Sequence, residues 1–267
     1  MNRRTRDIVL LVVGVAVVAA IGIGGYLAMH ARAEGSGSTQ DLAPIVLPST
    51  SASATTKPEP PPYERWMVGK VIQPLTAYAE PSTSSKTVTK LDKVNENGYP
   101  SLVLVDKTRE VKGKVWYKVW LAMRPNGTRG WIPEGKLAFY TTSAKITIDL
   151  SERKLSVQRR GELMGTYKVA VGKPGLSTPT GFFFINQKLR PPTTDGPYGV
   201  LALGISAFQM KIPATSWIQG GPVAIHGTNE PDLIGKAISH GCVRMHNKDV
   251  LEVSRLVPAG SPVEIVK

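Results

Sequence analysis

Short runs in which apolar and polar residues alternate are the feature that most constrains the fold of this chain. From Ile146 to Leu150 apolar residues alternate with polar ones, and after a turn at 151–153 Leu155 and Val157 resume the alternation. A period of two is typical of a strand with one buried face, and two such runs around a short turn predict a hairpin. Similar runs predict strands at 70–73, 101–105, 115–121, 130–132, 167–171, 181–185 and 263–266.

Helical patterns are scarce beyond the N-terminal region. The chain contains 26 Gly and 21 Pro residues, and turn sequences such as Asn126-Gly127 separate the alternating runs; these residues are typical of turns. The best helix candidate is 247–256, where Asn247 is a candidate cap and Val250 belongs to an apolar side. The patterns predict a mainly β chain that ends in a β-sandwich with one or two short helices.

One unbroken apolar stretch, Ile8 to Met29, spans 22 residues near the start of the sequence. A helix of this length crosses a bilayer. Arg3, Arg4 and Arg6 precede the stretch, so the positive-inside rule places the N-terminus in the cytoplasm and the rest of the chain outside. We therefore expect a single-pass anchor in the cell membrane, with the later domains facing the cell wall or periplasm. The alternative is a signal peptide cleaved near Ala33, although a typical signal core has only about 7–15 apolar residues.

Two segments of different character follow this stretch. Residues 34–62 are rich in Ser, Thr and Pro, a composition that predicts an extended linker without a core of its own. Residues 63–142 carry short strand patterns, and their end, Asn126–Leu137, resembles the last hairpin of bacterial Src-homology-3-like barrels. That resemblance implies a wall-binding or substrate-guiding module, or else a spacer that packs on the domain after it.

The chain is strongly basic, with a formal net charge of +13. A basic surface favours contact with nucleic acid, with anionic lipid or with an anionic wall polymer. The sequence contains no zinc finger and no RNA-binding signature, and its positive residues are scattered singly or in pairs such as Arg159-Arg160. We interpret the charge as a solvated surface in polyanionic surroundings, with anionic cell-wall polymers as possible partners and no nucleic acid.

The only cysteine of the chain, Cys242, lies in a segment that also holds three of the four histidines. A thiolate is a far better nucleophile than a thiol, and a neighbouring histidine can take the proton to form a thiolate–imidazolium pair. His226 precedes Cys242 by enough residues to come from an adjacent strand. Gly241 permits close approach to a substrate oxyanion, and Arg244 shares a face with Cys242 if the segment is extended. This pattern favours nucleophilic catalysis, with Arg244 holding a substrate carboxylate.

A zinc site is the other interpretation of this segment. Its ligands would be His226, His240, Cys242 and His246, a set that zinc accepts. The spacing His240-x-Cys242 is tighter than is usual in structural zinc sites, and 239–246 contains no carboxylate for a general base. We therefore expect no metal and no other cofactor.

The same residues resemble the L,D-transpeptidase family with a YkuD-type catalytic domain. That family carries a histidine, a gap and then Ser/Thr-His-Gly-Cys, which His226 and Ser239-His240-Gly241-Cys242 match. The surrounding strings 178–182, 198–199 and 224–227 also match in order, so the resemblance spans about residues 144–267. Some members carry Asn where this chain has Arg244.

The resemblance implies a peptidoglycan enzyme and assigns roles to its residues. Cys242 would attack the third residue of a tetrapeptide stem and release D-Ala, and His226 would accept the thiol proton. The carbonyl of Gly227 would orient the His226 ring, and backbone N–H groups around Gly241 and Cys242 would form the oxyanion hole. A second stem peptide would then resolve the acyl-enzyme as a 3→3 crosslink. Carbapenems would react at the same cysteine.

Ser239, His240, Gly241 and Arg244 are candidate substrate-binding residues. We expect the His240 side chain to brace the loop and the Ser239 hydroxyl to make a local or substrate hydrogen bond. His246 is expected to be exposed or to lie at the start of the helix.

The predicted organisation has four parts. They are a cytoplasmic stub and transmembrane anchor at 1–33, a linker at 34–62, a Src-homology-3-like β-barrel at 63–142 and an L,D-transpeptidase β-sandwich at 143–267. An L,D-carboxypeptidase, in which water takes the acyl group, is the nearest alternative function. In a sortase-like enzyme the His, Cys and Arg residues are expected to lie much further apart in sequence. In a papain-like peptidase the Cys precedes the His. Both alternatives are therefore disfavoured. A wall-binding protein with a vestigial site is the non-enzymatic alternative.

Overall fold

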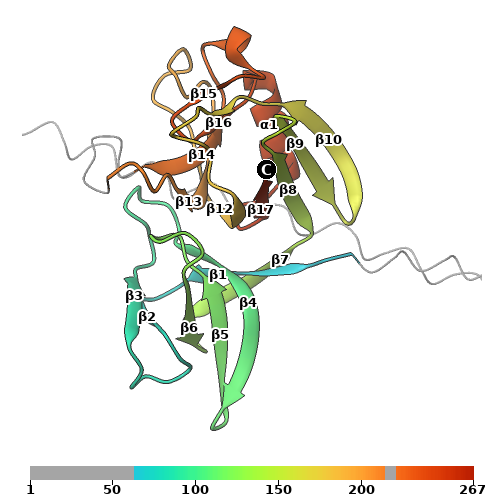
Figure 1. Ribbon diagram of the computed structural model, residues 1–267. Helices are drawn as coiled ribbons and strands as arrows, with labels where there is room; N and C mark the ends of the chain where they lie inside the picture. The colour runs from blue at the N-terminus through green and yellow to red at the C-terminus, as the bar shows by residue number, and fades with distance from the viewer. Residues whose placement is uncertain (1–62, 214–220) are drawn as a thin grey trace, which may run out of the picture. The chain divides into compact units, whose positions relative to one another are not determined.

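A computed structural model describes residues 63–213 and 221–267 of the chain (Figure 1). The predicted anchor at 1–33 and linker at 34–62 lie outside the described residues. Within those ranges no helix is long and apolar enough to cross a membrane. All described residues fall within one compact unit of the chain.

The first part of the described chain is a seven-stranded antiparallel sheet in the order β3-β2-β6-β5-β4-β1-β7. A cluster of buried apolar side chains, including Val71, Val103 and Ile132, holds its strands together. The strands predicted at 70–73, 101–105, 115–121 and 130–132 are found here with shifted bounds; the Src-homology-3-like assignment stays a prediction. The strands are β1 (Trp66–Val71), β2 (Leu75–Tyr78), β3 (Thr87–Leu91), β4 (Leu102–Val111), β5 (Lys114–Trp120), β6 (Arg129–Pro133) and β7 (Leu137–Thr142).

The expected hairpin at Asn126–Leu137 is wrong. Strand β6 pairs with β5 and β2, whereas β7 pairs with β1 along six residues. Gly69 on β1 lies against the Leu137 side chain, so the missing side chain of the glycine leaves room for Leu137 in the core. Packing of Leu137 against β1 therefore takes the chain away from β6 after the turn.

The second part is an eight-stranded sheet in the order β10-β9-β8-β17-β12-β13-β14-β16, with a separate pair β11-β15. The predicted hairpin is found as β8 and β9. The expected strand at 167–171 is interrupted, because Val169 and Ala170 lie between β10 and β11. The strands are β8 (Ala144–Asp149), β9 (Lys154–Arg159), β10 (Glu162–Lys168), β11 (Val171–Gly172), β12 (Gly181–Leu189), β13 (Ala202–Phe208), β14 (Pro222–His226), β15 (Ala237–Ser239), β16 (Val243–Arg244) and β17 (Pro262–Val266).

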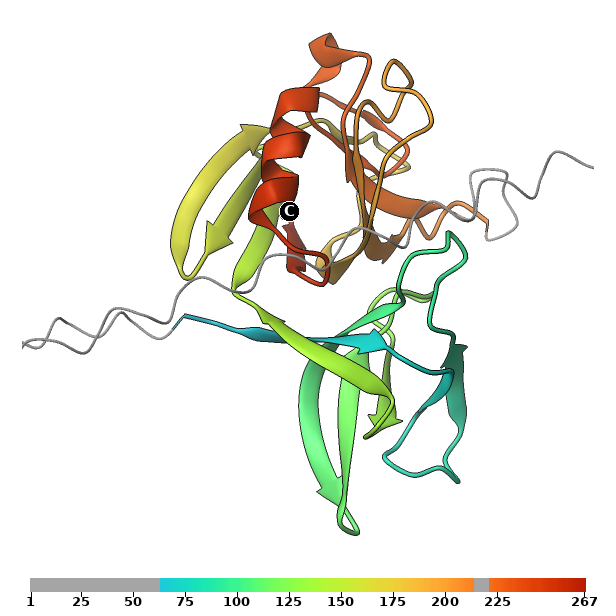
Figure 2. The ribbon, with the colours of Figure 1, turned by 180° about the vertical axis from the view of Figure 1, so that it is seen from behind.

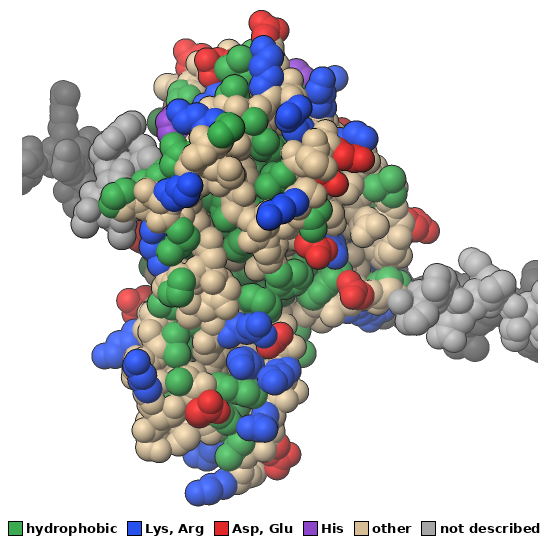
Figure 3. All heavy atoms as spheres, viewed as in Figure 1, with side chains coloured by type: hydrophobic (Ala, Val, Ile, Leu, Met, Phe, Trp, Pro, Cys, Tyr) green, Lys and Arg blue, Asp and Glu red, His purple; other side chains and the backbone are tan. Residues whose placement is uncertain are grey.

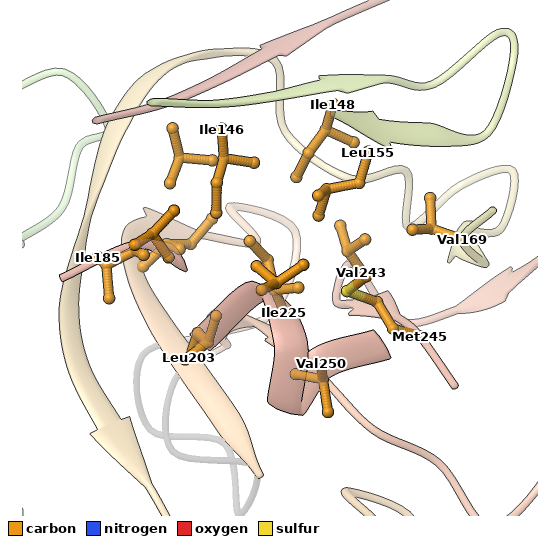
Figure 4. Close-up of a cluster of buried hydrophobic side chains, with 14 of the residues drawn as sticks. Ile146, Ile148, Leu155, Val169, Ile185, Leu203, Ile225, Val243, Met245 and Val250 are labelled. Carbon is orange, nitrogen blue, oxygen red and sulfur yellow. The ribbon is translucent and has the colours of Figure 1, made fainter. Parts of the chain in front are cut away.

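This second sheet encloses the larger core. Side chains from both ends of its strand order, such as Ile146 and Leu155 on one side and Leu203 and Ile225 on the other, belong to one buried cluster. Figure 4 shows these side chains converging on a common centre. The opposing faces give the sheet the sandwich-like arrangement expected from the alternating patterns.

The predicted helix is confirmed as α1 (Asn247–Leu256), which lies between the β9–β10 side and the β13–β14 side of the fold (Figure 2). A single 3-10 turn, η1 (Pro231–Leu233), is the only other helical element among the described residues. The expected cap is wrong: His246 occupies the N-cap position, and Asn247 is the first helical residue. The Asn247 side chain instead accepts hydrogen bonds from the N–H groups of Val200 (3.3 Å) and Thr228 (3.1 Å).

The two sheets pack directly against each other. Val68 and Leu104 of the first sheet share a buried cluster with Phe184 of the second, and the rings of Trp120 and Phe182 lie 5.2 Å apart. The first sheet is therefore joined to the second through apolar contacts. Lys and Arg side chains lie scattered among acidic and uncharged ones on the face that Figure 3 shows.

Candidate active site

The end of β14 and the start of β16 bring the predicted site residues together. The two strands are parallel neighbours, with Ile225 opposite Val243 and His226 opposite Arg244. Ile225 and Val243 are fully buried and point into the core (Figure 4). Because side chains alternate across a strand, His226 and Arg244 point to the other face, as does Cys242, which directly precedes β16. The pairing of these strands thus places the candidate base and the candidate nucleophile on one face.

His226 is held in one orientation. Its side chain is 3% exposed, and the carbonyl of Gly227 lies 2.6 Å from Nδ1. A carbonyl only accepts hydrogen bonds, so Nδ1 carries the proton and Nε2 is left with a free lone pair. This is the contact that the family resemblance implied for Gly227.

Burial lowers the pKa of His226 to about 4, although the hydrogen bond to Gly227 acts in the opposite direction. The positive charge of Arg244 adds to the lowering. An imidazole in this position is neutral at physiological pH and is competent as a base.

Cys242 is the only cysteine and carries a free thiol. Burial raises the pKa of this thiol, while a backbone hydrogen bond from Ala224 and the charge of Arg244 lower it. Because the pKa of His226 is lowered and the pKa of the Cys242 thiol is raised, the resting pair is a neutral thiol and a neutral imidazole. Burial acts in this direction on both groups because it penalises the charged form of each.

Ser239 organises the loop that leads to Cys242. Its hydroxyl donates to the carbonyl of Cys242 (2.6 Å) and accepts from the N–H of Gly241 (3.1 Å). The local hydrogen bond predicted for Ser239 is confirmed. The His240 side chain is exposed, and its expected bracing of the loop stays a prediction. Since the Gly241 N–H is already engaged, only the Cys242 N–H is left as an oxyanion donor from the predicted pair.

Arg244 lies beside the pair with most of its side chain buried. Its Nη1 donates to Glu230 Oε2 at 2.6 Å, and the side chain of Glu230 is 52% exposed. The Nε of Arg244 is buried and has no hydrogen-bond partner among the described residues. A guanidinium with a donor left over is suited to a carboxylate ligand.

The four candidate zinc ligands do not gather. His226 is buried beside Gly227, His240 is exposed, and His246 lies at the N-cap of α1. Across 63–213 and 221–267, no group of three His, Cys, Asp or Glu side chains is close enough to hold a metal ion.

Two residues join the site that the sequence did not single out for a role. The ring of Tyr198 lies over that of His226, with centroids 4.8 Å apart, and Tyr198 is 49% exposed. Burial and the nearby Cys242 raise the pKa of Tyr198. Asn247 ties the backbone on either side of this pair, at Val200 and Thr228. The sequence marked Asn247 only as a helix cap and Tyr198 only within a family-matching string, because both contacts depend on loops that meet only in the folded chain.

A pocket of 530 Å³ is lined by Thr228, two residues after His226, and by the start of α1. It adjoins the His226 side of the site through Thr228. Its lining residues are Thr194, Asp195, Thr228, Asn229, Pro231, His246, Asn247 and Lys248.

Comparisons with known proteins agree with this geometry. A family model described as the L,D-transpeptidase catalytic domain, YkuD, matches residues 143–265. The Bacillus subtilis protein YkuD, an L,D-transpeptidase by name, is 40% identical over 126 residues, which are 47% of this chain and 68% of that protein. Its namesake from Bacillus licheniformis is 41% identical over 125 residues, 47% of this chain and 67% of that one.

Among solved structures, the catalytic domain of the Enterococcus faecium L,D-transpeptidase is 23% identical. The match covers 46% of this chain and 96% of that one, with a TM-score of 0.37. The relationship rests on the sequence matches. Because the B. subtilis relative is 40% identical across 68% of its own length, and the family model covers the same region, this chain belongs to the L,D-transpeptidase family of the YkuD type.

Proposed function

We propose that this chain is a peptidoglycan L,D-transpeptidase in which Cys242 is the acyl-accepting nucleophile and His226 its base. The observation that carries the proposal is the parallel pairing of β14 and β16, which gives His226 and Cys242 a common face. The hydrogen bond from His226 Nδ1 to Gly227 adds to it, because the ring then offers Nε2 as the base. The carbonyl of Gly227 takes the orienting role that a carboxylate has in a catalytic triad.

Acylation begins when His226 Nε2 takes the proton of the Cys242 thiol. The sulfur attacks the carbonyl carbon of the third stem residue, a diamino acid such as meso-diaminopimelate, and a C–S bond forms. The tetrahedral intermediate then expels D-Ala, whose amine takes the proton from the imidazolium. A neutral resting pair suits this sequence, since the proton moves only as the sulfur attacks.

Two groups near the sulfur stabilise the substrate. The Cys242 N–H is the donor for the oxyanion, because the Gly241 N–H is already bound to Ser239. Arg244 holds a substrate carboxylate through guanidinium N–H groups other than those of the Nη1 that binds Glu230. Ser239 and Gly241 act through the shape of the loop, and His240 is free to meet substrate at the surface.

Transpeptidation is completed when an amine takes the acyl group from Cys242. The side-chain amine of a second stem attacks the thioester, His226 takes its proton, and the thiol returns to Cys242 as the 3→3 peptide bond forms. The pocket of 530 Å³ beside Thr228 provides room for this acceptor on the His226 side. Attack by water in place of the amine would make the enzyme an L,D-carboxypeptidase.

Incubation of the full-length chain with a purified disaccharide-tetrapeptide tests the proposal. We expect free D-Ala and a 3→3-linked dimer, both identified by mass spectrometry of the products. Release of D-Ala together with tripeptide monomer and no dimer would show that the enzyme is an L,D-carboxypeptidase and not a transpeptidase. Absence of both products from folded protein would contradict the acyl-transfer function and favour a wall-binding protein.

We also infer that the chain acts outside the cytoplasm, held by the anchor predicted at Ile8–Met29. The seven-stranded sheet at 63–142 would then be a Src-homology-3-like module close to wall polymers, and its buried Trp131 agrees with that type of barrel. Protease added to cells whose outer layers are permeabilised should digest the C-terminal domains while a cytoplasmic marker stays intact. Protection of the C-terminal domains would contradict this topology, and full recovery of the protein in the medium would favour cleavage near Ala33.

A further inference from the structure

The loop between β5 and β6, residues 121–128, reaches the second sheet at the end of β13 (Figure 1). Asn126 binds both backbone groups of Phe208: the N–H of Phe208 donates to Oδ1 and the Nδ2 of Asn126 donates to the carbonyl, each at 2.8 Å. One amide side chain thus takes the place of a strand partner for Phe208. These hydrogen bonds tie the last residue of β13 to the first sheet.

Arg124 extends the same contact beyond β13. Its Nη2 donates to the carbonyls of Gln209 (3.1 Å) and Ile212 (2.7 Å), and the guanidinium lies 5.5 Å from the centre of the Phe208 ring. Charge-assisted hydrogen bonds of this kind are stronger than neutral ones. The loop therefore fixes the path of the chain from Phe208 to Ile212.

Gln209, in the middle of this path, touches the loop that carries Cys242. It is 5% exposed, and its Nε2 donates to the carbonyl of Ser177 at 2.7 Å. A Cβ placed on Gly241 would lie 3.2 Å from Nε2 and 3.3 Å from Cβ of Gln209, so Gln209 packs on the backbone of Gly241. Gly241 has φ +124°, a conformation suited to glycine.

We infer that Asn126 is a positioning residue for Cys242, acting through Phe208 and Gln209 on Gly241. The inference rests on the proposed acylation of Cys242. The hydroxyl of Ser239 holds the loop from Ser239 to Cys242 by hydrogen bonds. The side chain of Gln209 packs against the same loop at Gly241. When Asn126 is lost, the end of β13 loses its anchor and Gln209 shifts away from Gly241. A displacement of about 1 Å at a reacting group costs up to ~100-fold in rate.

A second contact between the same two sheets supplies a matched control. Asn97 Nδ2 donates to Gln187 Oε1 at 3.3 Å, on β12, and that hydrogen bond does not lead to the Cys242 loop. Asn97→Ala therefore removes an asparagine hydrogen bond between the sheets and leaves the contact of Gln209 with Gly241 unchanged.

The experiment measures acylation of the full-length chain by a carbapenem at several concentrations, for wild type, Asn126→Ala and Asn97→Ala. Intact mass gives the adduct, and the concentration dependence separates the limiting acylation rate from the half-saturating concentration. For Asn126→Ala we expect the limiting rate to fall at least ~10-fold with little change in half-saturation. Asn97→Ala should stay within about twofold of wild type in both, because it perturbs no group near the sulfur. A purely structural role for Asn126 would lower the melting temperature without changing the limiting rate of the folded protein.

Each outcome has one meaning. An Asn126→Ala protein that acylates at the wild-type rate overturns the inference, as does an equal loss in Asn97→Ala. If Asn126→Ala does not fold, Asn126→Asp replaces it: the carboxylate keeps the volume and the bond from the Phe208 N–H but sets an oxygen against the Phe208 carbonyl, and a wild-type rate in that variant also overturns the inference. Absence of an adduct on the wild type would instead refute the acylation of Cys242 itself.

Discussion

Cys242→Ala will leave the chain without any carbapenem adduct, whereas the wild type will gain the mass of one inhibitor per chain. Cys242 is the only cysteine of the chain, so the variant has no thiol that a carbapenem could acylate. Removal of a catalytic nucleophile typically lowers turnover by a factor on the order of 10⁶, so stem-peptide exchange should also fall below detection. Intact mass spectrometry and product analysis measure the two effects.

A melting curve serves as the control for this variant. Cys242 precedes β16 and its neighbour Val243 fills the core, so truncation of the thiol should leave the fold intact. An adduct of equal mass on folded Cys242→Ala would show that another group is acylated, and it would remove Cys242 from the mechanism.

His226→Gln will lower the limiting acylation rate by roughly 10²–10⁴-fold, the usual contribution of a general base. The pKa of the Cys242 thiol is raised by burial, so few molecules hold a thiolate at neutral pH without a base. The residual rate of the variant should follow the thiolate fraction. It should therefore increase about tenfold for each unit by which the pH is raised, as long as the pH stays below the pKa of the thiol.

The wild type should behave differently over the same range. The pKa of His226 is lowered to about 4, so the imidazole is deprotonated and active throughout the neutral range, and is lost as a base only when the pH falls toward that value. We therefore expect a nearly flat wild-type rate between about pH 5 and pH 8. A wild-type rate that falls with a midpoint near 6.5 would mean that His226 is not desolvated, and equal rates for wild type and His226→Gln would exclude it as the base.

The neutral resting pair has a consequence for selectivity. A neutral thiol reacts slowly with general alkylating reagents, because the thiolate is the form that attacks. A ligand that places a carbonyl against the sulfur lets His226 remove the proton during the attack. Arg244 contributes to this balance, since its charge favours the thiolate and disfavours the imidazolium.

The residue types of the site and the positions of most strands followed from local sequence. The alternation around Ile146 and Leu155 predicted β8 and β9, and the apolar side of 247–256 predicted α1 with its bounds. The upstream histidine and the string at 239–242 indicated both the chemistry and the family. Such signals are visible in sequence because they span a few residues and reflect only the local periodicity of burial.

Local patterns failed where a polar side chain had a choice of partners. Asn247 was expected to cap its own helix, but it binds the N–H groups of Val200 and Thr228. Val200 and Thr228 lie in loops whose approach to Asn247 depends on packing, so this contact has no local signal.

The sequence by itself therefore determined that the chain folds mainly into strands, and it indicated which residues are candidates for acyl transfer. Tertiary structure alone decided the surroundings of those residues. The register of β14 on β16 sets His226 opposite Arg244, burial sets the directions of the pKa shifts of His226 and Cys242, and Asn126 meets Phe208 across 82 residues of chain. These properties depend on desolvation and on contacts between distant segments, which arise only when the core has closed.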